Sequence, residues 1–159
     1  MRKSPATMQS RFRAARNELA RHASVDGSRI GASGYCFGGS VVLDMARAGE
    51  DLKGVAAFHA GLPPSGAPAA AGRVRSKVLV LNGAADPFIK PDSVVAFKNE
   101  MDAALVDYRS IDDPGAVHAF TNPEATAKGK QFNLPLAYHP EADRQSKAEA
   151  AKFFSSVFR

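Results

Sequence analysis

The segment Gly34-Tyr35-Cys36-Phe37-Gly38-Gly39, which follows the short apolar stretch Arg29–Ser33, constrains the fold more than any other feature. It places the only cysteine of the chain between glycines, a pattern typical of a sharp turn from a strand into a helix. Because such a turn brings the backbone close to itself, we expect the three glycines to leave the necessary room. Cys36 would then lie at a helix N-terminus, where unpaired N–H groups and the helix dipole favour a thiolate.

Strands and helices are expected to alternate along the rest of the chain. The run Val78–Leu81 is continuously apolar, which is typical of a parallel strand covered by helices on both faces. A loop containing Asn122-Pro123 and Asn133-Leu134-Pro135 is expected before the last helix. The sequence therefore predicts an α/β fold with a mostly parallel sheet, in one domain over residues 1–159. We expect strands at 29–35, 52–59, 77–81 and 106–111, and helices at 7–22, 37–48, 91–105 and 142–158.

The net charge of +5 is concentrated in one segment. Residues 1–29 hold seven Lys/Arg and two Asp/Glu, whereas residues 30–159 hold fourteen of each. On a helical projection of this segment, an apolar stripe is expected to be buried, and arginines occupy the other sides. A solvated helix face explains the basic residues, so no nucleic-acid partner is expected. The stripe consists of Met8, Phe12, Ala15 and Leu19.

Three further features bear on the location of the protein. No run approaches the roughly 18 apolar residues of a membrane helix, so no membrane partner is expected. No apolar segment of the kind found in secretory signals follows Arg2 and Lys3. A single cysteine cannot form an internal disulfide, which favours a reducing compartment and hence the cytoplasm.

Three chemically active side chains follow three of the expected strands. Cys36 follows the first strand, Asp86 the third and His118 the fourth, so all three should meet at the carboxyl edge of a parallel sheet. Their order along the chain is that of nucleophile, acid and histidine in α/β-hydrolases. His118 would take the proton of Cys36, and Asp86 would fix the imidazole tautomer. The backbone N–H of Phe37 would stabilise the oxyanion.

Other interpretations of these residues remain open at this stage. Cys36 could be a small buried hydrophobe, Asp86 could serve the turn with Pro87, and His118 could be an ordinary loop histidine. His59 could face the pocket or pack against the Ala60-Gly61 turn, whereas His22 and His139 are expected at the surface. The sequence has no second cysteine and no cluster of ligands at metal-binding spacing, which argues against zinc and dithiol chemistry.

Several segments resemble the dienelactone hydrolase family of the α/β-hydrolase superfamily. The segment Gly34–Gly39 resembles its cysteine elbow, Val78–Pro87 its acid-bearing strand and loop, and Gly115–Pro123 its histidine loop. The closing helix, from Ala142-Asp143-Arg144 to Phe153-Phe154, also resembles that of the family. The resemblance implies a hydrolase of lactones or other carboxylic esters that works without a cofactor. The implied catalytic residues are Cys36, Asp86 and His118, and His59 and Phe120 are candidates for contact with the substrate.

The chain departs from that family before Ile30, where only one helix and no convincing strand is expected. In such folds several strands precede the elbow, and an earlier loop supplies the second oxyanion donor. We therefore interpret the chain as the C-terminal portion of an α/β-hydrolase domain with an intact triad but weak or absent activity. An uncovered sheet edge beside Ile30 would favour self-association. The alternative is a catalytically inactive remnant that acts as an interaction domain.

Overall fold

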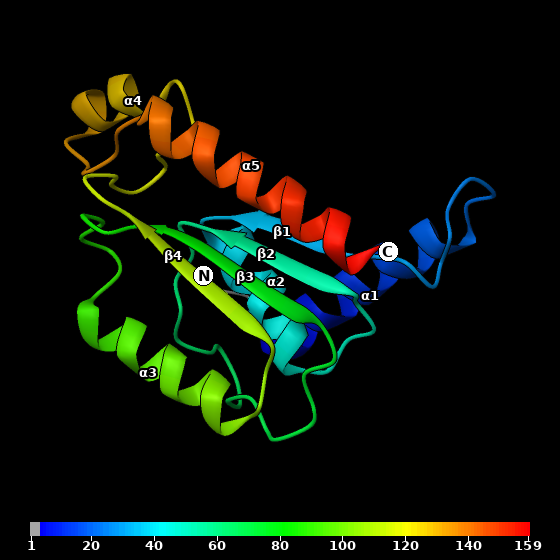
Figure 1. Ribbon diagram of the computed structural model, residues 1–159. Coiled ribbons are helices and arrows are strands. Elements are labelled where there is room, and N and C mark those ends of the chain that lie inside the picture. Colours follow the sequence, from blue (N-terminus) through cyan, green and yellow to red (C-terminus); the bar gives the residue numbers. More distant parts are fainter. Residues whose placement is uncertain (1–3) are drawn as a thin grey trace.

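The computed structural model describes residues 4–159 and contains one sheet of four parallel strands (Figure 1). The strands lie in chain order across the sheet, which confirms the predicted α/β fold with a mostly parallel sheet. Each crossover between neighbouring strands runs through a helix or a long connection, as parallel pairing requires. The strands are β1 (Ala32–Tyr35), β2 (Gly54–Phe58), β3 (Lys77–Gly83) and β4 (Tyr108–Asp113).

Helices cover both faces of the sheet because alternate residues of the central strands point to opposite sides. Val55 and Ala57 of β2 pack in the core formed with α1 (Pro5–Arg21), α2 (Phe37–Arg47) and α3 (Pro91–Ala103). Ala56 and Phe58 pack instead with aromatic residues of α5 (Pro140–Val157). Figure 1 shows α5 crossing the face of the sheet opposite α2. All five residues of β2 are buried, as expected for a strand with two apolar faces.

The structure contains one helix that the sequence did not predict, α4 (Ala125–Phe132), within the segment expected to be a loop. The helix is only eight residues long and contains Gly129, so its helical pattern is weak. A Cβ on Gly129 would lie 2.3 Å from the carbonyl oxygen of Leu136, which shows how closely the returning chain passes. Asn133 ends the helix in the left-handed conformation, with φ of 51°.

None of the four residues of the apolar stripe on α1 is fully buried, so the predicted burial is met only in part, by Met8 and Phe12. Ala15 is exposed and Leu19 is 48% exposed, while Phe12 is partly buried against the core. Surface ion pairs to the loop after α2 provide further contacts: Arg13 pairs with Glu50, and Arg16 with Asp51. Part of the basic character of this segment is therefore used in contacts within the chain. Arg2 and Lys3 lie outside the described residues. The expectation that no secretory signal follows them therefore concerns a part of the chain that the structure does not fully describe.

β1 forms one edge of the sheet and, within residues 4–159, pairs with β2 alone. β1 begins at Ala32, three residues later than the sequence predicts. The carbonyl of Ile30 accepts a hydrogen bond from the N–H of Lys53, and this bond lies outside the regular hydrogen bonds between β1 and β2. No helix in the described part of the chain is long and apolar enough to cross a membrane.

Candidate active site

Cys36 occupies a strained turn between β1 and α2. Its φ of 52° and ψ of −120° are rare for a residue with a side chain, and its N–H donates to the carbonyl of Phe58 at 3.0 Å. A Cβ on Gly34 would lie 2.2 Å from the carbonyl oxygen of Gly38, and one on Gly39 would lie 2.7 Å from the Cβ of Ala60. These two glycines make the turn possible, and they leave the side chain of Cys36 exposed.

The prediction that Gly38 also leaves necessary room is wrong. A Cβ placed on Gly38 meets no atom within 4 Å. Its own carbonyl group occupies the space opposite Gly34, so the close approach is between the Gly34 α-carbon and the Gly38 backbone. Of these two positions, Gly34 must therefore lack a side chain for steric reasons, whereas Gly38 need not.

The structure brings the three expected side chains into one hydrogen-bonded line. The Nε2 atom of His118 lies 3.0 Å from Sγ of Cys36, and its Nδ1 atom lies 2.8 Å from Oδ2 of Asp86. The side chain of Asp86 is fully buried, and its other oxygen accepts the N–H of Phe88 at 2.9 Å. With Nδ1–H donating to the carboxylate, Nε2 is free to accept the thiol proton.

Two loops that carry Asp86 and His118 are held together by their backbones. The N–H of Ala85 donates to the carbonyl of Ala116 at 3.0 Å. A Cβ on Gly83 would lie 2.2 Å from that same carbonyl oxygen, so glycine is required where the loops cross. These backbone contacts hold the two loops together independently of the hydrogen bond between the Asp86 and His118 side chains.

The surroundings of His118 favour its protonated form. The hydrogen bond to Asp86 raises the pKa of His118 above its ordinary value, burial opposes that effect, and the hydrogen bond to Cys36 adds to it. The ring of Phe88 packs edge-on against the imidazole with centroids 5.1 Å apart. A histidine that accepts a proton readily, beside an exposed thiol, can serve as a general base.

His59 and Phe120, the two candidates for contact with the substrate, pack behind His118 and are buried. His59 is 3% exposed and Phe120 fully buried, so neither ring offers surface to a ligand in this structure. The His59 ring lies edge-on to His118 at 5.1 Å, and its Nε2 atom is 3.0 Å from Oγ1 of Thr121. Burial, followed by the proximity of His118, lowers the pKa of His59 to about 4, so its ring stays neutral.

The remaining expected residues are placed as follows. Phe37 is the first residue of α2, where its N–H lacks a partner within the helix, and its side chain is half exposed. His22 is exposed as predicted, whereas His139 is partly buried and caps α5 by accepting the N–H of Ala142.

The sequence analysis did not identify Phe88 as part of the site, although its position two residues after Asp86 was an available signal. Across residues 4–159, no group of three or more His, Cys, Asp or Glu is placed to hold a metal ion.

A nucleophile at a strand-to-helix turn, with an acid and a histidine at the same edge of a parallel sheet, defines the α/β-hydrolase class. The fold itself is shared with MGS-M1, an α/β hydrolase enzyme from a Medee basin deep-sea metagenome library. It superposes with a TM-score of 0.73 over 97% of this chain and 64% of that chain, at 11% identity. The model of the Dienelactone hydrolase family matches residues 1–158, and the chain belongs to that family.

Two relatives differ in how much of their length this chain spans. P91, described as a dienelactone hydrolase-like promiscuous phosphotriesterase from metagenomic libraries, is 37% identical, with a TM-score of 0.89. That match covers 97% of this chain and 63% of P91, so the chain spans less than two thirds of that structure. The uncharacterized protein K02A2.1 of Caenorhabditis elegans is 32% identical over 153 residues, which are 95% of this chain and 94% of that protein.

Proposed function

We propose that the chain hydrolyses lactones or other carboxylic esters, with Cys36 as the nucleophile. The observation that carries the proposal is the unbroken line of contacts from Asp86 through His118 to the exposed sulfur of Cys36. Membership of the Dienelactone hydrolase family supports the same class of substrate. The only side chains the reaction requires are these three, each at the end of a strand or in the loop after it.

In the first half of the reaction, Nε2 of His118 takes the thiol proton as Sγ of Cys36 attacks the acyl carbon. A tetrahedral oxyanion forms, and the N–H of Phe37 at the start of α2 donates to it. As the carbon–oxygen bond to the leaving alcohol breaks, His118 returns the proton to that oxygen, and a thioester on Cys36 remains.

In the second half, His118 takes a proton from water, and the resulting hydroxide attacks the thioester carbon. Collapse of this second intermediate expels the Cys36 thiolate, which recovers a proton from His118, and releases the carboxylic acid. Asp86 keeps the imidazole in the required tautomer through both halves. If Phe37 is the one oxyanion donor that residues 4–159 supply, we expect a rate about 10²–10³ below that of a two-donor site.

The test is steady-state hydrolysis of p-nitrophenyl acetate and of a simple lactone by the wild-type chain and by Cys36→Ala. We expect measurable turnover by the wild type and a fall to background, about 10³-fold or more, in the variant. Ser155→Ala, an exposed change on α5 away from the site, is the matched control and should retain the wild-type rate. Turnover that survives Cys36→Ala would contradict the role of Cys36 as the nucleophile, whereas a wild-type chain without turnover would favour the alternative of an inactive domain with a binding role.

A further inference from the structure

A cavity of about 490 Å³ lies beside the turn that carries Cys36. Phe37, the residue after the cysteine, forms part of its wall, and so does Phe88, whose ring packs against His118. We call it the elbow pocket. Its volume is in the range of small-molecule sites. The elbow pocket is bounded by the N-terminal end of α1, the start of α2, the loop after β2 and Phe88. Its lining residues are Ser4, Pro5, Met8, Phe37, Ser40, Val41, Asp44, Gly61, Pro63, Ser65 and Phe88.

The walls of the elbow pocket are mainly apolar, and among residues 4–159 Asp44 is the one charged residue that lines it. The carboxylate of Asp44 is already engaged: Oδ1 accepts from Arg47 at 3.2 Å and from the Ser65 amide at 3.3 Å, and Oδ2 accepts the Ser65 hydroxyl. None of the described residues that line the pocket is a lysine or an arginine. A carboxylate bound there would therefore lose water without gaining a cation from the described lining.

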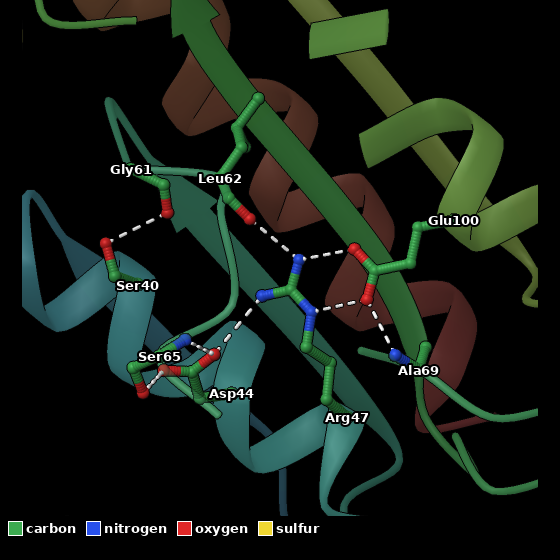
Figure 2. A network of polar contacts seen from close by, with 8 residues as sticks. All are labelled: Ser40, Asp44, Arg47, Gly61, Leu62, Ser65, Ala69 and Glu100. Atoms are coloured by element: carbon green, nitrogen blue, oxygen red, sulfur yellow. Dashed lines mark hydrogen bonds and ion pairs between the residues drawn. The ribbon is translucent and has the colours of Figure 1, made fainter. Parts of the chain in front are cut away.

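The nearest buried cation is also unavailable to a ligand. Arg47 lines a neighbouring hollow of about 300 Å³ that shares Met8 and Asp44 with the elbow pocket. Figure 2 shows that each nitrogen of its guanidinium group is engaged. Nε and one terminal nitrogen donate to the two carboxylate oxygens of Glu100, each at 2.8 Å. The same terminal nitrogen also donates to the carbonyl of Leu62 at 2.7 Å. Its charge is balanced by two carboxylates, so it leaves no net positive field for an anionic ligand.

We propose that the elbow pocket holds the acyl chain of the substrate and selects an uncharged, apolar chain over one that ends in a carboxylate. The inference rests on the proposed function, because it takes Cys36 as the atom to which the acyl group becomes attached. The N–H of Phe37 faces the acyl oxygen in that proposal, and the Phe37 side chain lines the pocket, so the chain attached to the acyl carbon lies next to the cavity.

Covalent labelling of Cys36 tests the selectivity without requiring turnover. N-hexylmaleimide and 6-maleimidohexanoate differ only in a terminal methyl or carboxylate, and the chain has one cysteine to react with. Each rate constant is divided by that for N-acetylcysteine, which removes the intrinsic reactivity of the reagents. We expect the hexyl reagent to be favoured by about tenfold or more after this correction. Equal corrected rates would overturn the proposal.

A charge introduced on α1 gives the matched comparison. Met8→Lys places a cation in the lining of the elbow pocket and should reduce the preference to about threefold or less, because the ammonium can pair with the carboxylate reagent. Ser10→Lys adds the same charge on an exposed position of α1 that does not line the pocket, and it should keep the wild-type preference. An equal effect of both substitutions would show long-range attraction rather than a pocket and would overturn the assignment.

Hydrolysis separates this proposal from the one on which it rests. The wild-type chain should cleave p-nitrophenyl hexanoate with a kcat/KM about tenfold or more above that for mono-p-nitrophenyl adipate. If neither ester is cleaved while the maleimide preference persists, the pocket selects as inferred and the proposed hydrolase function fails. If both are cleaved at equal rates, the function stands and the selectivity of the elbow pocket is refuted.

Discussion

The Nδ1 atom of His118 lies 2.8 Å from Oδ2 of Asp86, a carboxylate that is shut off from solvent. This contact is the largest cause of the raised pKa of His118. It joins the loop after β3 to the loop after β4, so the same bond sets both the position and the basicity of the imidazole. Changes to Asp86 should therefore appear in the rate and in its pH dependence together.

Activity should depend on pH through His118. In the proposed reaction the neutral imidazole is the base, so kcat/KM should rise with pH. The midpoint should lie above the ordinary histidine pKa of 6.5 because Asp86 stabilises the protonated form. Asp86→Asn should move the midpoint downward and reduce kcat/KM by about 10²–10⁴. The measurement is the pH profile of ester hydrolysis, with Asp92→Asn, an exposed change on α3, as the control. An unmoved midpoint in Asp86→Asn would contradict this account of the pKa.

Stability should fall in mild acid because of His59. Its pKa is about 4 in the folded chain and 6.5 in the reference state, so below 6.5 the unfolded chain binds the proton that the folded chain does not. The contribution is present above pH 6.5 and is lost as the pH falls toward 4, by at most about 3 kcal/mol. Urea unfolding of wild type and His59→Gln across this window should give a difference that changes with pH. Parallel curves would show that His59 titrates normally.

Gly34 and Gly38, on either side of Cys36, should differ strongly in how much stability their replacement by alanine costs. Gly34→Ala places a Cβ 2.2 Å from a backbone oxygen, and it should reduce the free energy of unfolding by about 3 kcal/mol or more. Gly38→Ala adds a Cβ into open space in the first turn of α2, and it should change the free energy of unfolding by no more than about 1 kcal/mol. Thermal or urea unfolding of the two variants provides the comparison. Equal losses would mean that the turn is not closed as described.

The buried network of Arg47 should contribute far more to stability than an exposed ion pair. Burial alone would raise the pKa of Glu100, yet hydrogen bonds from Arg47 and the Ala69 amide hold it below its usual value. Arg47→Ala leaves two largely buried carboxylates without their cation, which should cost about 3–5 kcal/mol of unfolding free energy. Arg13→Ala removes a solvent-exposed guanidinium from its pair with Glu50 and should cost far less than Arg47→Ala. Similar losses in the two variants would contradict the inferred role of burial.

Much of this arrangement could be predicted because local chemistry and tertiary structure agree. The run Val78–Leu81 is entirely apolar, which favours a buried strand. The glycines around Cys36 allow the strained turn that other residues would block. Asp86 and His118 could be placed at one edge because parallel strands deliver their following loops to the same side.

Other features depend on contacts that the sequence does not display. The short α4 is stabilised by the chain passing Gly129, and the burial of α1 depends on which neighbours cover Ala15 and Leu19. His59 and Phe120 lie behind His118 because β2 and the histidine loop meet there, which periodicity does not reveal. The elbow pocket arises from four separate segments, so no single stretch of sequence predicts its apolar lining.

Within residues 4–159, β1 lies at the edge of the sheet, and self-association through that edge would have a kinetic consequence. Its outer peptide groups face away from β2, and Cys36 follows its last residue, so a strand contributed by a second molecule would end or begin next to the sulfur. We predict that such sharing would add N–H donors at the reacting carbon and make turnover per molecule rise with protein concentration, in step with the mass measured by light scattering. A specific activity that stays constant while the mass changes would show that each molecule works alone.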